Sequence, residues 1–173
     1  MVTSERRDIG SLEAARLVPN AMYYNATLYA PKTKGTLTRT EWHGTALRTL
    51  ERTDIVFLDP DNGLIVKSVG AGSSKSIKYV LMDELRDYYR AGHSVIFYNH
   101  RCRQSENDYL ERFRKLKNDP TFEGAEWLGL KFVRGTIRDY IFILQPNHAA
   151  MVSATTSSFL DSTWGRHSMR LSI

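Results

Sequence analysis

The chain has 173 residues, of which 42% are hydrophobic and 25% are charged, and this balance fits one globular domain and excludes a chain disordered throughout. No stretch approaches the roughly 18 consecutive apolar residues of a membrane span, and no apolar signal region begins the chain, so we expect a soluble cytoplasmic protein. The single cysteine, Cys102, excludes an internal disulfide and a cysteine-based zinc site. A net charge of +5 suits a polyanionic partner.

Two helices are predicted in the first third of the chain, with another short segment over residues 21–29 that ends before Pro31. Residues 11–17 have helical apolar spacing and are followed by Pro19, which ends the helix. In residues 39–52 the apolar side chains recur at the spacing of one helix face. Between them, residues 31–36 are rich in turn formers and predict a loop.

The middle of the chain has the pattern of a strand, a helix and a second strand. Residues 54–59 and 94–98 are unbroken runs of β-branched and aromatic residues, as in strands that are buried on both faces. The helix between them is predicted over residues 76–91, with Ser76 as its N-cap and Gly92 just after its end. This order predicts two adjacent parallel strands with residues 54–59 in the centre of the sheet.

The last third predicts a helix opened by Ser105, a pair of strands and a final helix over residues 148–164. The two strands, over residues 127–133 and 139–144, are close enough in sequence to form an antiparallel hairpin. We therefore expect an α/β fold: a Rossmann-like mixed sheet, mostly parallel with a C-terminal antiparallel hairpin, with helices on both faces. Residues 1–173 are expected to form a single Rossmann-like domain.

Polar residues directly follow both strands of the parallel pair. Asp59, Asp61 and Asn62 come after the first strand, and His100 ends the second. Ligands of open α/β sheets bind outside the carboxyl ends of the strands, so we expect these four residues to carry the catalytic chemistry. The alternative is turn chemistry, because Asp, Pro, Asn and Gly all favour turns. For His100 a structural role is an equal alternative.

Three further residues are candidates for substrate binding. Tyr98 is suited to stacking on a base, although core packing explains such an aromatic residue more often. Arg101 and Arg103 follow the second strand and belong to a group of cations that would attract phosphate, the alternative being an ordinary solvated surface. The expected partner is therefore nucleic acid or a nucleotide, with no membrane partner.

The segment from Asp54 to Asp61 resembles the fourth motif of class I S-adenosylmethionine-dependent methyltransferases, in which an acidic or amide residue and prolines end the fourth strand. The helix, strand, helix and hairpin that follow are similar to the C-terminal half of that fold. In the nucleic-acid amino-methyltransferases this tip grips the amino group that is methylated; here Asp61 stands in place of the second proline and Asn62 in place of an aromatic residue. The stretch from Arg7 to Trp164 further resembles a group of bacterial and phage proteins with the same Asp-Pro-Asp-Asn-Gly tip and a Tyr-x-His-Arg strand end.

The resemblance implies S-adenosylmethionine as a cofactor, but the residues do not predict its site. A methyltransferase opens with a strand and a glycine-rich turn, and no such element precedes residue 54, since Gly10 is isolated. The chain is therefore expected to lack the N-terminal cofactor-binding segment.

Three functions follow from these residues. The first is a methyltransferase-like Rossmann domain that acts on or binds nucleic acid or a nucleotide, in which Asp59 accepts a hydrogen bond from the target group, Asn62 orients that group and His100 removes a proton. The second is a metal-dependent nuclease or phosphohydrolase, in which Asp59 and Asp61, with Glu84 or His100, hold a divalent metal ion. The third is a non-catalytic binding module or a truncated relic of the fold.

Overall fold

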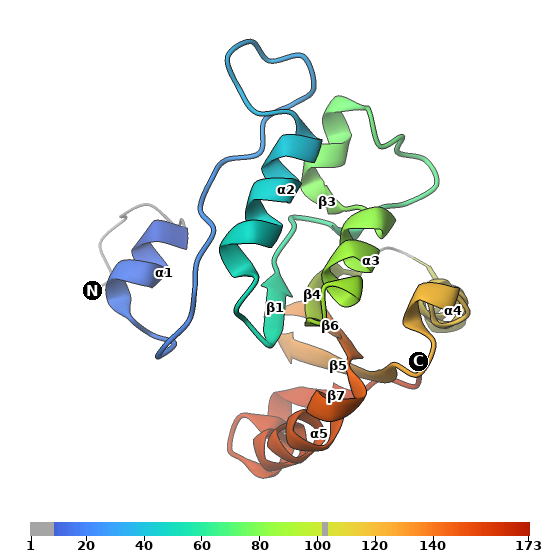
Figure 1. Ribbon diagram of the computed structural model, residues 1–173. Coiled ribbons are helices and arrows are strands. Elements are labelled where there is room, and N and C mark those ends of the chain that lie inside the picture. The colour runs from blue at the N-terminus through green and yellow to red at the C-terminus, as the bar shows by residue number, and fades with distance from the viewer. Residues whose placement is uncertain (1–8, 102–103) are drawn as a thin grey trace. The chain divides into compact units, whose positions relative to one another are not determined.

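The computed structural model describes residues 9–101 and 104–173, and the chain divides into two compact units, residues 1–53 and 54–173 (Figure 1). The first unit holds helices α1 (Ile9–Ala15) and α2 (Arg39–Leu50). A capping box opens α2, because the backbone N–H of Thr38 donates to the Glu41 carboxylate and the N–H of Glu41 donates to the Thr38 hydroxyl. Both helices expected in this region are confirmed, whereas residues 21–29, expected to form another short segment, form neither helix nor strand.

The second unit contains one large sheet and the helices that cover it. Its helices are α3 (Met82–Arg90), α4 (Glu106–Lys117) and α5 (Pro146–Asp161). The large sheet consists of β1 (Ile55–Leu58), β4 (Ser94–His100), β5 (Glu126–Arg134), β6 (Thr136–Leu144) and β7 (Ser168–Arg170). Short elements complete the unit: β2 (Gly63–Leu64), β3 (Tyr79–Val80) and the 3₁₀ helices η1 (Ser74–Lys78), η2 (Pro120–Phe122) and η3 (Gly165–His167).

The large sheet is mixed, with the strand order β1-β4-β6-β5-β7. As expected, β1 and β4 are adjacent and parallel, with Ile55 opposite Ser94 and Leu58 opposite Phe97. The expectation of a mostly parallel sheet is wrong, because β4–β6, β6–β5 and β5–β7 are all antiparallel. The predicted hairpin is confirmed, and its strand β6 pairs directly with β4, so the sheet has one parallel pair.

The expected central position of the first strand is also wrong. In the described residues β1 pairs with β4 alone and forms an edge of the sheet. Val56 is buried, but Phe57 keeps 55% of its surface exposed. An unbroken apolar run shows that a segment favours a strand, but it does not show how many strands flank it.

The crossover from β1 to β4 contains a shorter helix than the sequence predicts. Residues 74–80 form η1 and β3, and β3 pairs in parallel with β2. The Glu84 carboxylate accepts the backbone N–H of Leu81 at 2.8 Å at the start of α3, so Ser76 is not its N-cap. Gly92 follows the helix with φ of +93°, as expected of a residue in the C′ position.

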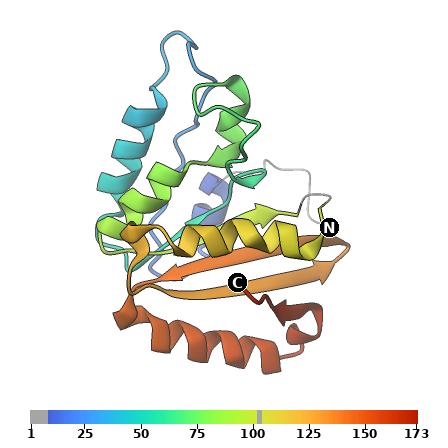
Figure 2. The same cartoon turned by 90° about the vertical axis from the view of Figure 1, so that its right-hand side faces the viewer.

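Helices cover both faces of the sheet, as expected (Figure 2). On one face α4 packs through Phe113, whose ring centre lies 6.2 Å from that of Phe97 in β4. On the other face, side chains of α5 pack against side chains of β5 and β6 and form one hydrophobic cluster with them. The buried members of this cluster are Leu128, Leu130, Phe142, Leu144, Ala149 and Val152.

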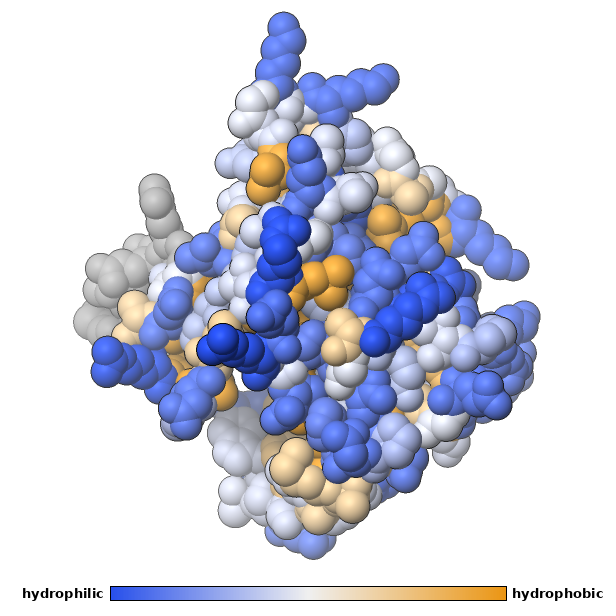
Figure 3. Space-filling model, viewed as in Figure 1, coloured by the Kyte–Doolittle hydropathy of each residue, from blue (hydrophilic) through white to orange (hydrophobic). Residues whose placement is uncertain are grey.

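The surface gives no sign of a broad apolar region on the face seen in Figure 3, where apolar side chains form separate spots between hydrophilic ones. Within residues 9–101 and 104–173, no helix has both the length and the apolar character needed to cross a membrane.

Candidate functional site

The parallel pairing of β1 and β4 brings the predicted site residues to one edge of the sheet. Leu58 lies opposite Phe97, so Asp59 comes level with Tyr98. Farther along, the backbone N–H of His100 donates to the carbonyl oxygen of Asn62 at 3.4 Å. The segment from Asp59 to Gly63 therefore runs beside the end of β4.

Glycine is required where this segment meets β4. Gly63 has φ of +92°, and a Cβ there would overlap the side-chain oxygen of Asn99. A side chain at residue 63 would therefore be excluded by both the backbone angle and the neighbouring strand. The Asn62 backbone N–H donates to the Lys78 carbonyl at 2.9 Å, next to the pairing of Gly63 with Tyr79, so this step is held by a segment distant in sequence.

Asn99 is a structural residue that the sequence interpretation missed. It is fully buried, and its Oδ1 accepts the backbone N–H of Leu64 at 2.9 Å. Its Nδ2 donates to the hydroxyl of Tyr109 at 2.7 Å and to the carbonyl of His100 at 3.1 Å. One amide thus connects the site segment, the end of β4 and helix α4.

Asp59 has the most perturbed carboxyl group of the predicted site. Its side chain reaches solvent, yet partial desolvation raises its pKa, the negative charge of Asp61 raises it further, and the positive charge of Arg138 opposes both. These interactions place the Asp59 carboxyl group near Arg138 in β6. A carboxyl group of this kind either accepts a hydrogen bond or exchanges a proton at a milder pH than an ordinary aspartate.

Asp61 is more exposed than Asp59. Its carboxylate lies 3.7 Å from the ammonium group of Lys78, and both side chains are more than half exposed. Exposed ion pairs of this kind add little to stability. The Asp61 carboxylate is therefore accessible to a ligand.

His100 and Tyr98 project from the same face of β4. The Tyr98 hydroxyl and the His100 Nδ1 are 2.8 Å apart, and the two rings meet edge to face. Burial raises the pKa of Tyr98, and Arg138 opposes that shift. Tyr98 thus orients the imidazole of His100, whose ring is exposed to solvent.

Three residues on the same face complete a group that the sequence did not reveal. Tyr140 has its ring centre 6.1 Å from that of Tyr98 and 6.3 Å from that of Phe57. Arg138 lies opposite His100 in the β4–β6 pair, and its side chain is exposed. We call this group the aromatic patch; its members are Phe57, Tyr98, His100, Arg138 and Tyr140.

Arg101 does not join this group. Its guanidinium lies 4.7 Å above the ring of Tyr109 in α4, on the other face of the sheet. There it forms ion pairs of 2.9 Å with the fully buried Asp139 and of 2.9 Å with Glu106, which also lies 3.5 Å from Lys131. Burial raises the pKa of Asp139, whereas hydrogen bonds and ion pairs with Tyr109 and Arg101 oppose the shift. Arg103 and Cys102 lie outside the described residues.

The described residues do not gather a metal site. No three His, Cys, Asp or Glu side chains among them come close enough to hold an ion together. Glu84, a candidate ligand in the metal-dependent alternative, is buried and caps α3 instead. Among the residues that the structure describes, only Asp59 and Asp61 therefore remain as candidate ligands for the metal-dependent alternative.

A serine–histidine pair at the opposite end of β4 also has a structural role. Ser94 Oγ lies 2.9 Å from His148 Nδ1, and His148 Nε2 lies 3.8 Å from the Asp54 carboxylate. Ser94 is fully buried and accepts the backbone N–H of Gln145 at 2.9 Å. Because no substrate reaches its oxygen, this pair attaches the start of α5 to β4.

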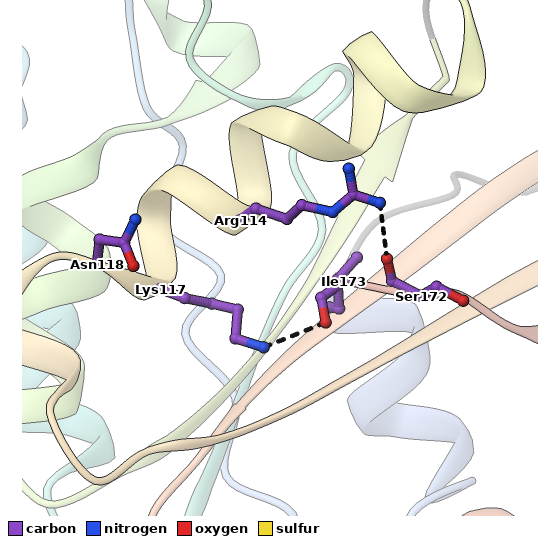
Figure 4. A pocket seen from close by; sticks show the side chains of 5 residues that line it. All are labelled: Arg114, Lys117, Asn118, Ser172 and Ile173. Atoms are coloured by element: carbon purple, nitrogen blue, oxygen red, sulfur yellow. Dashed lines mark hydrogen bonds between the residues drawn. The ribbon is translucent and has the colours of Figure 1, made fainter.

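A shallow hollow on α4 is lined by Arg114, Lys117, Asn118, Ser172 and Ile173 (Figure 4). Arg114 donates to the Ser172 carbonyl at 3.2 Å, and Lys117 donates to the Ile173 carbonyl at 3.1 Å. Its cations thus hold the end of the chain, on a helix that covers the face of the sheet opposite the aromatic patch.

Comparison with protein-family models, with curated proteins and with solved structures gave no match for this chain. The aromatic patch offers the exposed ring of Phe57, the half-buried rings of Tyr98 and Tyr140, one exposed guanidinium, one oriented imidazole, and the nearby carboxyl group of Asp59.

Proposed function

We propose that the aromatic patch binds nucleotide units of a nucleic acid, and that this chain is a nucleic-acid-binding α/β domain. The observation that carries the proposal is the grouping of three rings beside the exposed Arg138: the ring centre of Tyr140 lies 6.3 Å from that of Phe57 and 6.1 Å from that of Tyr98. Bases stack on aromatic rings regardless of sequence, and arginine pairs with phosphate. The net charge of +5 favours the same partner.

Each polar group near the rings has a role in this proposal. Arg138 binds a phosphate. Asp59 accepts a hydrogen bond from an exocyclic amino group or a ribose hydroxyl of the stacked nucleotide, and the oriented His100 contacts the same nucleotide. Asp61 and Asn62 shape the edge of the site through the segment that precedes Gly63.

A methyltransferase-like, Rossmann-like ancestry remains part of the proposal. The parallel β1–β4 pair with α3 between its strands supports it. Residues 9–53 contain helices and no strand, so they provide no strand and glycine-rich turn for S-adenosylmethionine. The described residues therefore do not fit that cofactor.

A binding assay with a short strand tests the proposal. The probe is a fluorescein-labelled thymidine trinucleotide, and its anisotropy is followed during titration with the full chain. Replacing Phe57 with alanine should weaken binding about fivefold or more, because stacking contributes roughly 1–3 kcal/mol per base. Arg138→Ala should weaken binding and make it less sensitive to salt.

The control is Met151→Ala, which removes another exposed apolar side chain, from α5. It should bind the trinucleotide like the unchanged protein. If the unchanged protein does not bind the trinucleotide, or if the Phe57 and Met151 variants bind equally well, the proposal is wrong.

A further inference from the structure

A second cationic and aromatic group lies beyond the aromatic patch, at the tip of the β5–β6 hairpin. The guanidinium of Arg134 lies 4.9 Å above the ring of Trp164, a residue that is 50% exposed. The ring of His167 lies 6.4 Å from Trp164, and Arg166 Nε donates to His167 Nε2 at 3.2 Å. We call this group the Trp164 patch; its members are Arg134, Trp164, Arg166 and His167.

The backbone fixes the position of the Trp164 patch. Gly165 is buried, and a Cβ there would overlap the carbonyl oxygen of Leu160 at the end of α5. Directly after η3, Ser168 pairs with Phe132 of β5. The chain thus turns tightly out of α5 and returns to the sheet, which places Trp164 over the hairpin.

The two patches are continuous on the sheet. Phe132 lies opposite Arg138 in the β5–β6 pair, and its ring lies 6.1 Å from that of His167. Side chains two residues apart in a strand share a face, so Arg134 projects from the same face as Phe132. From β1 to β5 the path crosses three strand spacings, about 15 Å in total.

The charge along this path is positive. Among the described residues, no carboxylate lies within ion-pair distance of Arg134, Arg138 or Arg166. Asp59 lies near Arg138 and offsets part of this charge, whereas Arg134 and Arg166 lie beside the exposed ring of Trp164 and the ring of His167. Exposed arginines that alternate with aromatic rings match the alternation of phosphate and base in a single strand. In a duplex the base faces are covered, so rings on a sheet surface cannot stack on them.

We propose that the Trp164 patch extends the aromatic patch into one binding track for single-stranded nucleic acid. This inference rests on the proposed function of the aromatic patch and adds the form of the ligand. A stacked strand rises about 3.4 Å per nucleotide, so a track of about 15 Å accommodates at least four nucleotides. A trinucleotide fills the aromatic patch, and a longer strand also reaches Trp164.

The test compares a thymidine trinucleotide with a thymidine octanucleotide, both labelled with fluorescein. The unchanged protein should bind the octanucleotide at least tenfold more tightly. Trp164→Ala and Arg134→Ala should each remove most of this gain, about fivefold or more, while leaving trinucleotide binding unchanged. Lys115→Ala, which removes an exposed cation from α4, is the matched control and should retain the gain.

The outcomes separate this inference from the proposal on which it rests. If the trinucleotide binds through Phe57 but the octanucleotide gain survives in the Trp164 and Arg134 variants, the track is wrong and the aromatic patch stands. If the trinucleotide does not bind, the proposed function itself fails. If a twelve-base-pair duplex binds as tightly as the octanucleotide, the single-strand assignment is overturned.

Discussion

Replacing Asn99 with alanine should destabilise the second unit strongly, although the residue stands only one position from the exposed His100. The substitution removes the acceptor for the Leu64 N–H and the donor to the Tyr109 hydroxyl, at 2.9 and 2.7 Å. It also removes the donor to the His100 carbonyl. All of these bonds come from one fully buried amide.

The size of the effect follows from these losses. A buried N–H left without a partner costs about 1–3 kcal/mol, and this cost applies to Leu64. The lost bond to Tyr109 adds about 1 kcal/mol, and the small cavity adds to the total. We expect a loss of about 3 kcal/mol in the free energy of unfolding. For a chain of this length, that corresponds to a decrease of roughly 6–12 °C in the melting temperature.

Urea unfolding followed by far-ultraviolet circular dichroism measures this loss. Asn118→Ala is the matched control, because Asn118 is an exposed asparagine at the end of α4. It should change the free energy of unfolding by less than about 0.5 kcal/mol. Equal effects of the two substitutions would refute the argument that Asn99 connects the site segment to α4.

Two further predictions concern the acidic residues of the site. Asp61→Ala should leave the melting temperature within about 2 °C of the unchanged protein in a thermal scan, because its ion pair with Lys78 is exposed; a larger loss would mean that the carboxylate stabilises the turn. The pKa of Asp59 is raised by desolvation and by Asp61, and Arg138 opposes the shift, so this carboxylate becomes neutral at a higher pH than an ordinary aspartate. A thymidine strand has neither an exocyclic amino group nor a ribose 2′-hydroxyl to donate to Asp59, so for this probe the charged carboxylate only repels phosphate. Binding of the thymidine strand should therefore strengthen as the pH falls from 7 to 5. In a His100→Gln background, Asp59→Asn should make binding, measured by anisotropy, less dependent on pH. If the dependence of binding on pH is unchanged in this variant, Asp59 does not face the strand.

Local patterns predicted the elements that depend on neighbouring residues. Ser105 caps α4 by accepting the backbone N–H of Asp108 at 3.2 Å, as its position before an amphipathic run indicates. Gly92 follows the end of α3, and the apolar runs over residues 54–59 and 94–98 form the strands β1 and β4. In each case the governing contacts lie within a few residues.

The errors arise where contacts distant in sequence decide the structure. Residues 79–80 carry a helical pattern in sequence, yet they pair with β2 because the site segment folds back on them. The parallel sheet was inferred from one strand–helix–strand unit, and nothing local shows that β6 lies beside β4. Because β6 pairs with β4 in the antiparallel sense, most of the sheet is antiparallel.

The position of β6 beside β4 also explains why only some of the site residues could be predicted. The strand-end rule brings Asp59 and His100 together, since both follow strands of one parallel pair. Arg138 and Tyr140 reach the site from β6, through a pairing of residues about 40 positions apart. The sequence did contain a signal, which is that successive side chains over residues 138–141 point to opposite faces of a strand. This alternation becomes informative only when the partner strand is known.

The two faces of β4 explain why Arg101 and His100 differ although they are neighbours in sequence. Side chains alternate along a strand, so Asn99 and Arg101 face α4, whereas Tyr98 and His100 face the aromatic patch. The buried bonds of Asn99 to Tyr109 and of Arg101 to Asp139 fix this register, because a shift by one residue would expose both pairs. In the proposed function, Arg101 therefore acts only through the position of its neighbours, and the exposed Arg138 is the guanidinium that binds the phosphate.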